Sequence, residues 1–152
     1  MTRKRPDRLL DGEVTSRIIG AFYESYNELG FGFLEAVYRR ALATELRARG
    51  LEIEEEAPVE VLYKGVVVGF FRIDLLVERR VVVEIKANSQ LSPTDRRQLL
   101  NYLRATRCEV GLLLHFGPQP DFFRLVSQNH SRLARDIIGP SGSNPAVCVS
   151  SV

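Results

Sequence analysis

The first third of the chain contains two stretches whose apolar residues recur every three or four positions, which is the spacing of one face of a helix. They predict a helix from Val14 to Leu29, with Thr15 or Ser16 as its N-cap, and a second helix from about Phe33 to Arg49. A glycine follows each stretch and can end the helix. The apolar positions are Ile18, Ile19, Phe22, Tyr26 and Leu29 in the first stretch, and Leu34, Val37, Tyr38, Ala41, Leu42 and Leu46 in the second.

The middle of the chain changes to the two-residue alternation of strands. Pro58 to Lys64 alternates, and after a Lys-Gly turn the strand pattern resumes over Val66 to Phe70. Gly69 leaves open whether this second strand contains a bulge or runs on unbroken. Phe71 to Val77 and Val81 to Ala87 then predict two antiparallel strands joined by a three-residue turn.

The last part of the chain predicts a crossover. Ser92 to Asp95 supplies an N-cap, a proline at the first helical position and an acid at the third, so a helix should begin here and reach about Arg107. Glu109 to Phe116 is nearly all apolar and predicts a buried strand parallel to the strand before the helix. Phe122 to Val126 predicts a short strand and Arg132 to Ile138 a terminal helix. The order α, α, β, β, β, α, β predicts one α/β domain with a mixed sheet.

Composition sets the class of protein. A chain of 152 residues that is 45% hydrophobic and 26% charged suits one soluble globular domain. We expect a basic, flexible segment over residues 1–12, the domain over 13–138 and a disordered tail rich in Gly, Pro and Ser over 139–152. The formal net charge of +2 predicts no partner by itself, so any affinity for nucleic acid has to come from local clusters of charge.

The sequence also predicts a compartment. Its first residues are polar and basic, unlike a signal peptide, and its apolar runs are too short to span a bilayer. Cys108 and Cys148 lack the spacing of a metal motif. One lies at a predicted strand start and the other in the tail, so we expect no disulfide and a reducing compartment. We therefore predict a cytoplasmic protein without a membrane partner.

The two antiparallel strands around the three-residue turn place several charges together. If Val77 faces Val81, then Asp74 faces Glu84, and directly opposed Cβ atoms lie roughly 4.5–5.5 Å apart. Lys86 falls on the same face because side chains alternate along a strand. The odd positions predict a wholly apolar opposite face, formed by Phe71, Ile73, Leu75, Val77, Val81, Val83, Ile85 and Ala87.

Two carboxylates with open coordination positions suit a hard cation such as Mg²⁺, and a lysine beside them can stabilise hydroxide or the charge that grows on a phosphate. The alternative is a solvated sheet face with a cross-strand salt bridge. The same register places Arg72 opposite Lys86, and opposed like charges destabilise a sheet unless an anion relieves them. This conflict favours a functional patch over a surface tuned only for stability.

Three further polar residues are candidates on the helices. Gln98 and Tyr102 are four positions apart and share a helix face, although each alone also suits an ordinary helix surface. Glu35 stands near a helix start, where a carboxylate suits the helix dipole. The lone histidines His115 and His130 pair with no cysteine and no second histidine, and we assign them no role.

The candidate residues belong to an ordered set of motifs. Gly32 to Tyr38 fits G-x-x-E-x-x-Y, and Asp74 to Val77, Glu84 to Ala87 and Gln98 to Leu103 follow it in order. Together they resemble the GxxExxY proteins, a branch of the PD-(D/E)XK nuclease superfamily, over roughly residues 14 to 126. Ile73 stands where the superfamily name has proline. The resemblance implies a restriction-endonuclease-like α-β-β-β-α-β core, with a mixed central sheet flanked by helices.

The resemblance also implies roles for the site residues. The catalytic residues that it implies are Asp74, Glu84, Lys86 and Glu35, of which the three acids would bind Mg²⁺, with Mn²⁺ able to substitute. The residues expected to position the substrate are Gln98 and Tyr102, which resemble the Q-x-x-x-Y element of RecB-type nucleases, together with Arg72 and Tyr38. Arg96 or Arg97 is expected to grip phosphates.

We therefore predict a Mg²⁺-dependent nuclease that hydrolyses phosphodiester bonds in DNA, with RNA left open as a substrate. One alternative is a catalytically silent subunit that binds nucleic acid and retains the nuclease fold. Another is a plain interaction domain with a solvated charged face, in which removing the charge of Asp74 should raise stability or leave it unchanged. The predicted partner is nucleic acid, and a homodimer or a protein complex is left open.

Overall fold

Residues 11–127 are the part of the chain that the structure, a computed structural model, describes. Their helices are α1 (Gly12–Leu29), α2 (Glu35–Ala48) and α3 (Pro93–Ala105). Their strands are β1 (Ile53–Tyr63), β2 (Val66–Val77), β3 (Val81–Lys86), β4 (Val110–Phe116) and β5 (Pro120–Val126). The helix predicted over Arg132–Ile138 lies outside the described residues, as do His130 and most of the two predicted end segments.

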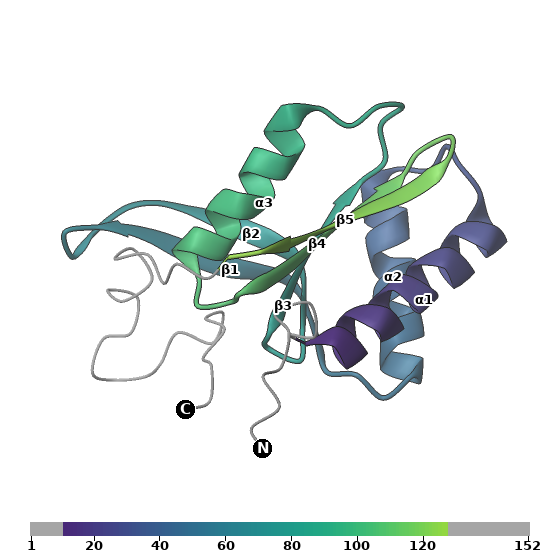
Figure 1. Ribbon diagram of the computed structural model, residues 1–152, viewed down its shortest axis with the longest axis horizontal. Helices are drawn as coiled ribbons and strands as arrows, with labels where there is room; N and C mark the ends of the chain where they lie inside the picture. The colour runs from purple at the N-terminus through teal and green to yellow at the C-terminus, as the bar shows by residue number, and fades with distance from the viewer. Residues whose placement is uncertain (1–10, 128–152) are drawn as a thin grey trace, which may run out of the picture.

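The strands form one mixed sheet in the order β1-β2-β3-β4-β5. β3 and β4 are parallel, and the other neighbouring strands are antiparallel. Figure 1 shows α1 and α2 together on one side of the sheet and α3 on the other. The predicted α/β class, with a mixed sheet flanked by helices and a parallel crossover through α3, is therefore confirmed.

Each face of the sheet has its own apolar core. Under α1 and α2, Phe116 of β4 packs edge-to-face against Phe22 and stacks on Tyr38 with ring centroids 4.3 Å apart. Under α3, Leu99 and Leu103 pack with residues of β2, β3 and β4. Because β3 and β4 are covered on both faces, nearly every residue in them is buried, as the apolar runs in the sequence indicate.

At Asp74 the side chains of β2 switch sides, so that odd-numbered residues before and after it face opposite sides of the sheet. Leu75 belongs to the core under α1 and α2, whereas Phe71 and Ile73 pack in the core under α3, although all three occupy odd positions. The β1–β2 ladder is interrupted here, since Asp74 has no regular pair with Glu56, whose φ is 51°. The predicted single apolar face is therefore wrong upstream of Asp74, because an irregularity in a strand rotates the side chains that precede it.

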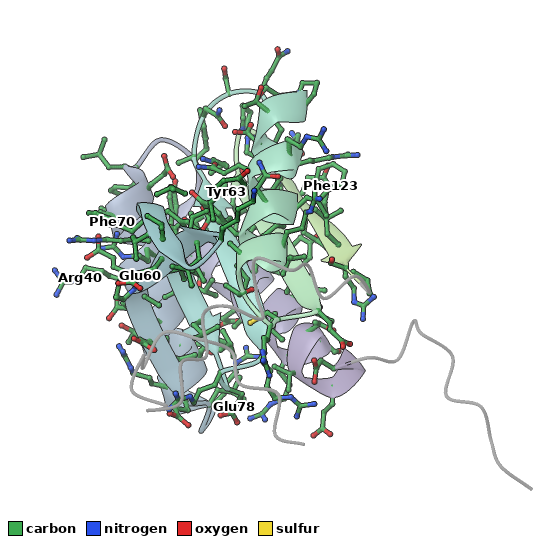
Figure 2. All side chains as sticks on the ribbon, turned by 90° about the vertical axis from the view of Figure 1, so that its left-hand side faces the viewer. Arg40, Glu60, Tyr63, Phe70, Glu78 and Phe123 are labelled. Carbon is green, nitrogen blue, oxygen red and sulfur yellow. The ribbon has the colours of Figure 1, made fainter. Side chains whose placement is uncertain are left out.

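Beyond this point β1 and β2 continue as a hairpin arm, residues 57–73, whose base packs against α3 and whose tip extends past the helices (Figure 1). The ladder shifts register opposite Gly69, so β2 is one long strand that contains a bulge. The tip of the arm exposes large apolar side chains, including Tyr63 and Phe70. Phe70 is 75% exposed and stands at the edge of the molecule in Figure 2.

Several element starts differ from those predicted, including that of β5, which begins at Pro120 and not at Phe122. α1 begins at Gly12, and Thr15 lies inside its first turn with its hydroxyl donating to the Gly12 carbonyl at 3.1 Å, so the predicted N-cap is wrong. α2 begins at Glu35, and Leu34, which was predicted on the buried stripe, is 78% exposed. β1 starts earlier than predicted, at Ile53. Backbone contacts fix the ends of an element, and the side-chain pattern locates them only to within a few residues.

One of the two cysteines lies in the part of the chain that the structure describes. Cys108 is buried just ahead of β4, and the predicted absence of a disulfide depends on Cys148. Cys148 lies outside the described residues. Within residues 11–127, none of the helices is long and apolar enough to cross a membrane.

The β1–β2 turn provides a test of backbone strain. Gly65 has a φ of 79° and open space where a Cβ would stand, so Gly65→Ala should cost about 1–2 kcal/mol of unfolding free energy from conformation alone. Gly69 also has open space around it but no positive φ, so Gly69→Ala should be neutral or stabilise by about 0.4–1 kcal/mol. Urea unfolding of both variants measures the difference, and equal effects would show that the turn is not strained.

Candidate active site

Asp74 and Glu84 are linked through the backbones of β2 and β3. The regular ladder between these strands ends at the pair Leu75–Val83. Beyond it, the N–H of Asp74 donates to Oε1 of Glu84 at 3.2 Å, and the N–H of Ile85 donates to Oδ2 of Asp74 at 2.8 Å. Side-chain oxygens thus take the place of backbone carbonyls, and the two acids lie together as the register predicts.

Burial makes the charged forms of both carboxyl groups unfavourable. Glu84 is 4% exposed, and its burial, followed by the nearby charge of Asp74, raises its pKa to about 9. Burial also raises the pKa of Asp74, and the hydrogen bond from the Ile85 N–H opposes that rise. The two carboxyl groups share a side-chain hydrogen bond, so the pair retains a proton at neutral pH. A bound cation can replace that proton.

Lys86 is held against this pair by α3. Its Nζ donates to Oε1 of Gln98 at 3.1 Å and lies 3.8 Å from Oδ1 of Asp95. The Gln98 amide in turn donates to the Tyr102 hydroxyl at 2.6 Å. Asp95 also closes the start of α3, where its Oδ2 accepts from the Ser92 N–H at 2.8 Å. One face of α3 therefore supplies three polar side chains that position the ammonium group.

Tyr102 is itself fixed by the base of the hairpin arm. Its ring stacks on Phe71 with centroids 3.9 Å apart and an angle of 6° between the ring planes. Burial, followed by the charge of Glu84, raises the pKa of the Tyr102 hydroxyl, which therefore keeps its proton at neutral pH. The Gln98–Tyr102 pair is thus ordered before any ligand arrives.

Glu35 reaches the same region from the other layer, as the first residue of α2. Burial raises its pKa; Lys86 lowers it, and Asp74 and Asp95 raise it further. All three charges can act on Glu35 only because its carboxyl group lies within their electrostatic range. Three acids from three elements, together with Asp95, therefore surround Lys86.

Tyr38 lies in the core under α1 and α2 and is fully buried. Its hydroxyl donates to the Gly30 carbonyl and accepts from the Phe33 N–H at 3.1 Å. These bonds fix the loop that leads into α2 and so set where Glu35 begins the helix. The structure thus places Tyr38 as a support for this loop and not on a surface that meets a substrate.

Arg72 is not brought to the site by β3. It lies beyond the end of the β2–β3 ladder, is exposed, and pairs with Pro58 of β1. Lys86 instead pairs with His115 of β4. The predicted opposition of Arg72 and Lys86 is therefore wrong, because β2 leaves β3 at Asp74.

Two site residues were missed by the sequence analysis. Asp95 was assigned only to the helix cap, although its spacing to Gln98 and Tyr102 places all three on one face of α3. Arg39 follows Glu35 by one helical turn, and its charge lowers the pKa of Asp74. The helical spacing from residues already singled out could have indicated both.

The acidic side chains of the site decide which metal ion it can hold. Within residues 11–127, no three Asp, Glu, His or Cys side chains are close enough to hold one. Mg²⁺ commonly takes one or two protein carboxylates and keeps several waters, so the Asp74–Glu84 pair alone fits that ion.

Comparison with known proteins places the chain in a wider group. A family model described as the PD-(D/E)XK nuclease superfamily matches residues 12–125. None of the curated proteins matches the chain. One similar solved structure, described as "Crystal structure of SSO0001", has 19% identity and a TM-score of 0.43, and the match covers 88% of this chain and 69% of that one. That likeness is too distant to bear on the fold.

Replacing Glu84 by Gln should stabilise the metal-free protein at pH 8. The folded-state pKa of Glu84 is raised from 4.5 to about 9, so between these values the folded protein holds a proton that the unfolded chain has lost. Stability therefore falls as pH rises through this window, by up to about 1.4 kcal/mol per pH unit. Glutamine does not titrate, and we expect Glu84→Gln to exceed wild type by about 1–3 kcal/mol at pH 8 and by much less near pH 5.

Urea unfolding with a chelator present measures this difference across the pH range. Glu60→Gln, an exposed site on the hairpin arm, is the matched control and should follow the wild-type pH profile. An offset between Glu84→Gln and wild type that stays constant from pH 5 to pH 8 would contradict a raised pKa.

Proposed function

Because the chain belongs to the PD-(D/E)XK nuclease superfamily, we propose that it hydrolyses phosphodiester bonds in DNA with a divalent metal ion, Mg²⁺ or Mn²⁺. The observation that carries this proposal is the group formed by Asp74, Glu84 and Lys86, in which a buried and a half-buried carboxyl group lie together beside a positioned ammonium. The motif Gly32–Tyr38 supports the narrower assignment to the GxxExxY branch.

The acids would hold the ion. Asp74 and Glu84 are the ligands, and Glu35 adds a further negative charge from α2. When bound, the ion supplies Lewis acidity to a phosphoryl oxygen and lowers the pKa of a coordinated water. Holding the ion would require both carboxyl groups to be ionised, so Glu84 would have to give up the proton that it carries at neutral pH.

Lys86 stabilises the charge that develops during the reaction. Attack of a water oxygen on phosphorus, followed by breakage of a P–O ester bond, increases negative charge on the phosphoryl oxygens. The Lys86 ammonium is already oriented by Gln98, so it can meet this charge without reorganising. Tyr102 holds the Gln98 amide in that orientation. The exposed Arg72 and Arg96 can grip phosphates on either side of the reacting one.

A catalytically silent subunit that binds nucleic acid is the second candidate. One observation favours it: no three Asp, Glu, His or Cys side chains among the described residues are close enough together to hold a metal ion. In that case the charged group would recognise a phosphate backbone without cutting it. Binding that survives chelation, with no cleavage by the wild-type protein under any metal condition, would support this reading.

A cleavage assay tests the main proposal. Wild type should cut single- or double-stranded DNA in the presence of Mg²⁺ or Mn²⁺, and an RNA strand in a parallel assay tests the choice of substrate. Lys86→Ala removes a preorganised charge, and Asp74→Asn removes a ligand charge, so each should lower the rate at least about 100-fold.

Lys64→Ala is the matched control for Lys86→Ala, because Lys64 is an exposed lysine at the turn of the hairpin arm. It should cut at nearly the wild-type rate. If Lys86→Ala and Asp74→Asn cut as well as wild type does, the activity does not come from this site. If the wild type cuts none of the substrates, the nuclease proposal is wrong.

A further inference from the structure

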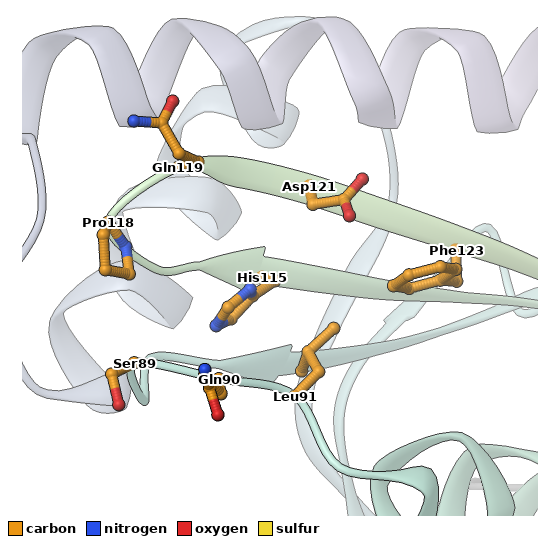
Figure 3. Close-up of a pocket in the computed structure, with 8 residues that line it drawn as sticks. All are labelled: Ser89, Gln90, Leu91, His115, Pro118, Gln119, Asp121 and Phe123. Carbon is orange, nitrogen blue, oxygen red and sulfur yellow. The ribbon is translucent and has the colours of Figure 1, made fainter.

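A pocket lies beside the candidate active site on the same face of the sheet. Lys86 pairs with His115 across β3 and β4, and His115 pairs with Asp121 across β4 and β5. Side chains of directly paired residues point to the same face, so this row continues from the site toward the edge of the sheet. His115 and Asp121 both line a pocket of about 370 Å³ (Figure 3).

The polar groups of this pocket suit a neutral ligand that has hydrogen-bonding edges. Ser89, Gln90 and Gln119 supply one hydroxyl and two amides, and Asp121 supplies a carboxylate. Amides and hydroxyls both donate and accept hydrogen bonds. None of the described lining residues is Lys or Arg, and the carboxylate would repel a phosphate. The pocket therefore suits the part of a nucleotide that carries no charge.

The apolar walls suit a flat ring. Leu91, Pro118 and Phe123 complete the lining, and Figure 3 shows Leu91 and Phe123 at one end of the pocket and Pro118 at the other. Arg96 of α3 lies over the Phe123 ring, with its guanidinium carbon 3.5 Å from the ring centroid. A cation at this wall can neutralise a phosphate that remains outside while a base enters.

The floor of the pocket is held in place. The His115 ring bonds through Nε2 to the Asn88 carbonyl at 2.7 Å, which ties the segment after β3 to β4. A Cβ at position 117 would lie 2.4 Å from that ring, so only glycine allows the turn after β4 to pass so close to it. The hydrogen bond of His115 and the close approach of Gly117 thus fix the backbone at two sides of the pocket.

We propose that this pocket binds one unpaired nucleobase of the nucleic-acid strand whose phosphodiester group is held at Lys86. The inference rests on the proposed function, and it adds a requirement for single-stranded or unpaired substrate next to the cut. The volume lies near the lower end of small-molecule sites, roughly 300–1,000 Å³, which suits one nucleotide and not a peptide. Neighbouring strands are about 4.8 Å apart, so a base in the pocket belongs to a nucleotide adjoining the reacting phosphate.

Binding without cleavage provides the test. The probes are a single-stranded DNA of about six nucleotides and an abasic strand of the same length and charge, both titrated by fluorescence polarisation with a chelator present. A stacked base contributes roughly 1–3 kcal/mol, so wild type should bind the base-bearing strand roughly five- to 150-fold more tightly. Ser89→Leu fills the pocket and should lower that preference at least about fivefold, with binding of the abasic strand unchanged.

Ser16→Leu is the matched control, because Ser16 is exposed on α1 across the sheet, and it should keep the wild-type preference. Gln119→Ala removes an amide from the pocket without filling it and should also lower the preference. It replaces Ser89→Leu in the test if that variant does not fold. The pocket proposal is overturned if wild type binds both strands equally, or if both pocket variants keep the full preference. If the pocket variants lower the preference but wild type cuts no DNA, the proposed function is wrong and the pocket proposal stands.

Discussion

A pair of carboxyl groups between β2 and β3, one buried and one half-buried, is the constraint on which the rest of the domain depends. Asp74 and Glu84 can stay inside the fold because each accepts a backbone hydrogen bond that the β ladder would otherwise have used. Even so, burial leaves one of them protonated at neutral pH. Lys86, Glu35 and Arg39 converge on the pair from β3 and α2, so the helices do more than cover a sheet. They complete an arrangement of charge that a sheet alone would not tolerate.

The central part of this arrangement could be predicted from the sequence, because a short turn leaves little freedom of register. Once Val77 is opposite Val81, the positions of Asp74 and Glu84 follow, and the structure has this register. The crossover could be predicted for a similar reason. A strand that is apolar on both faces and follows a capped helix must be buried on both faces, and the middle of the sheet is where that occurs. Sequence patterns predicted the structure correctly where they allowed only one arrangement of the backbone.

The rest depended on features that have no mark in the sequence. Glu56 adopts a positive φ, which is uncommon for glutamate, and nothing in a run of glutamates identifies which one does so. That single irregularity reversed the faces upstream of Asp74 and separated Arg72 from Lys86. Asp95 was overlooked for a different reason, because one carboxylate both caps α3 and approaches the lysine, and the first use already explained its presence.

The strand order has a consequence for how the domain forms. Since the strands are arranged in the sheet as they occur in the chain, every neighbouring pair is also a pair of successive strands. Most of these pairs close by short hairpins, and the parallel pair β3–β4 alone must wait for a whole helix to be laid down between its members. Gln98 and Asp95 are carried by that helix. A nascent chain that ends at Lys86 therefore already contains both acids but lacks the groups that orient the ammonium. The candidate active site is complete only after β4 has paired with β3, which is the slowest step set by the topology.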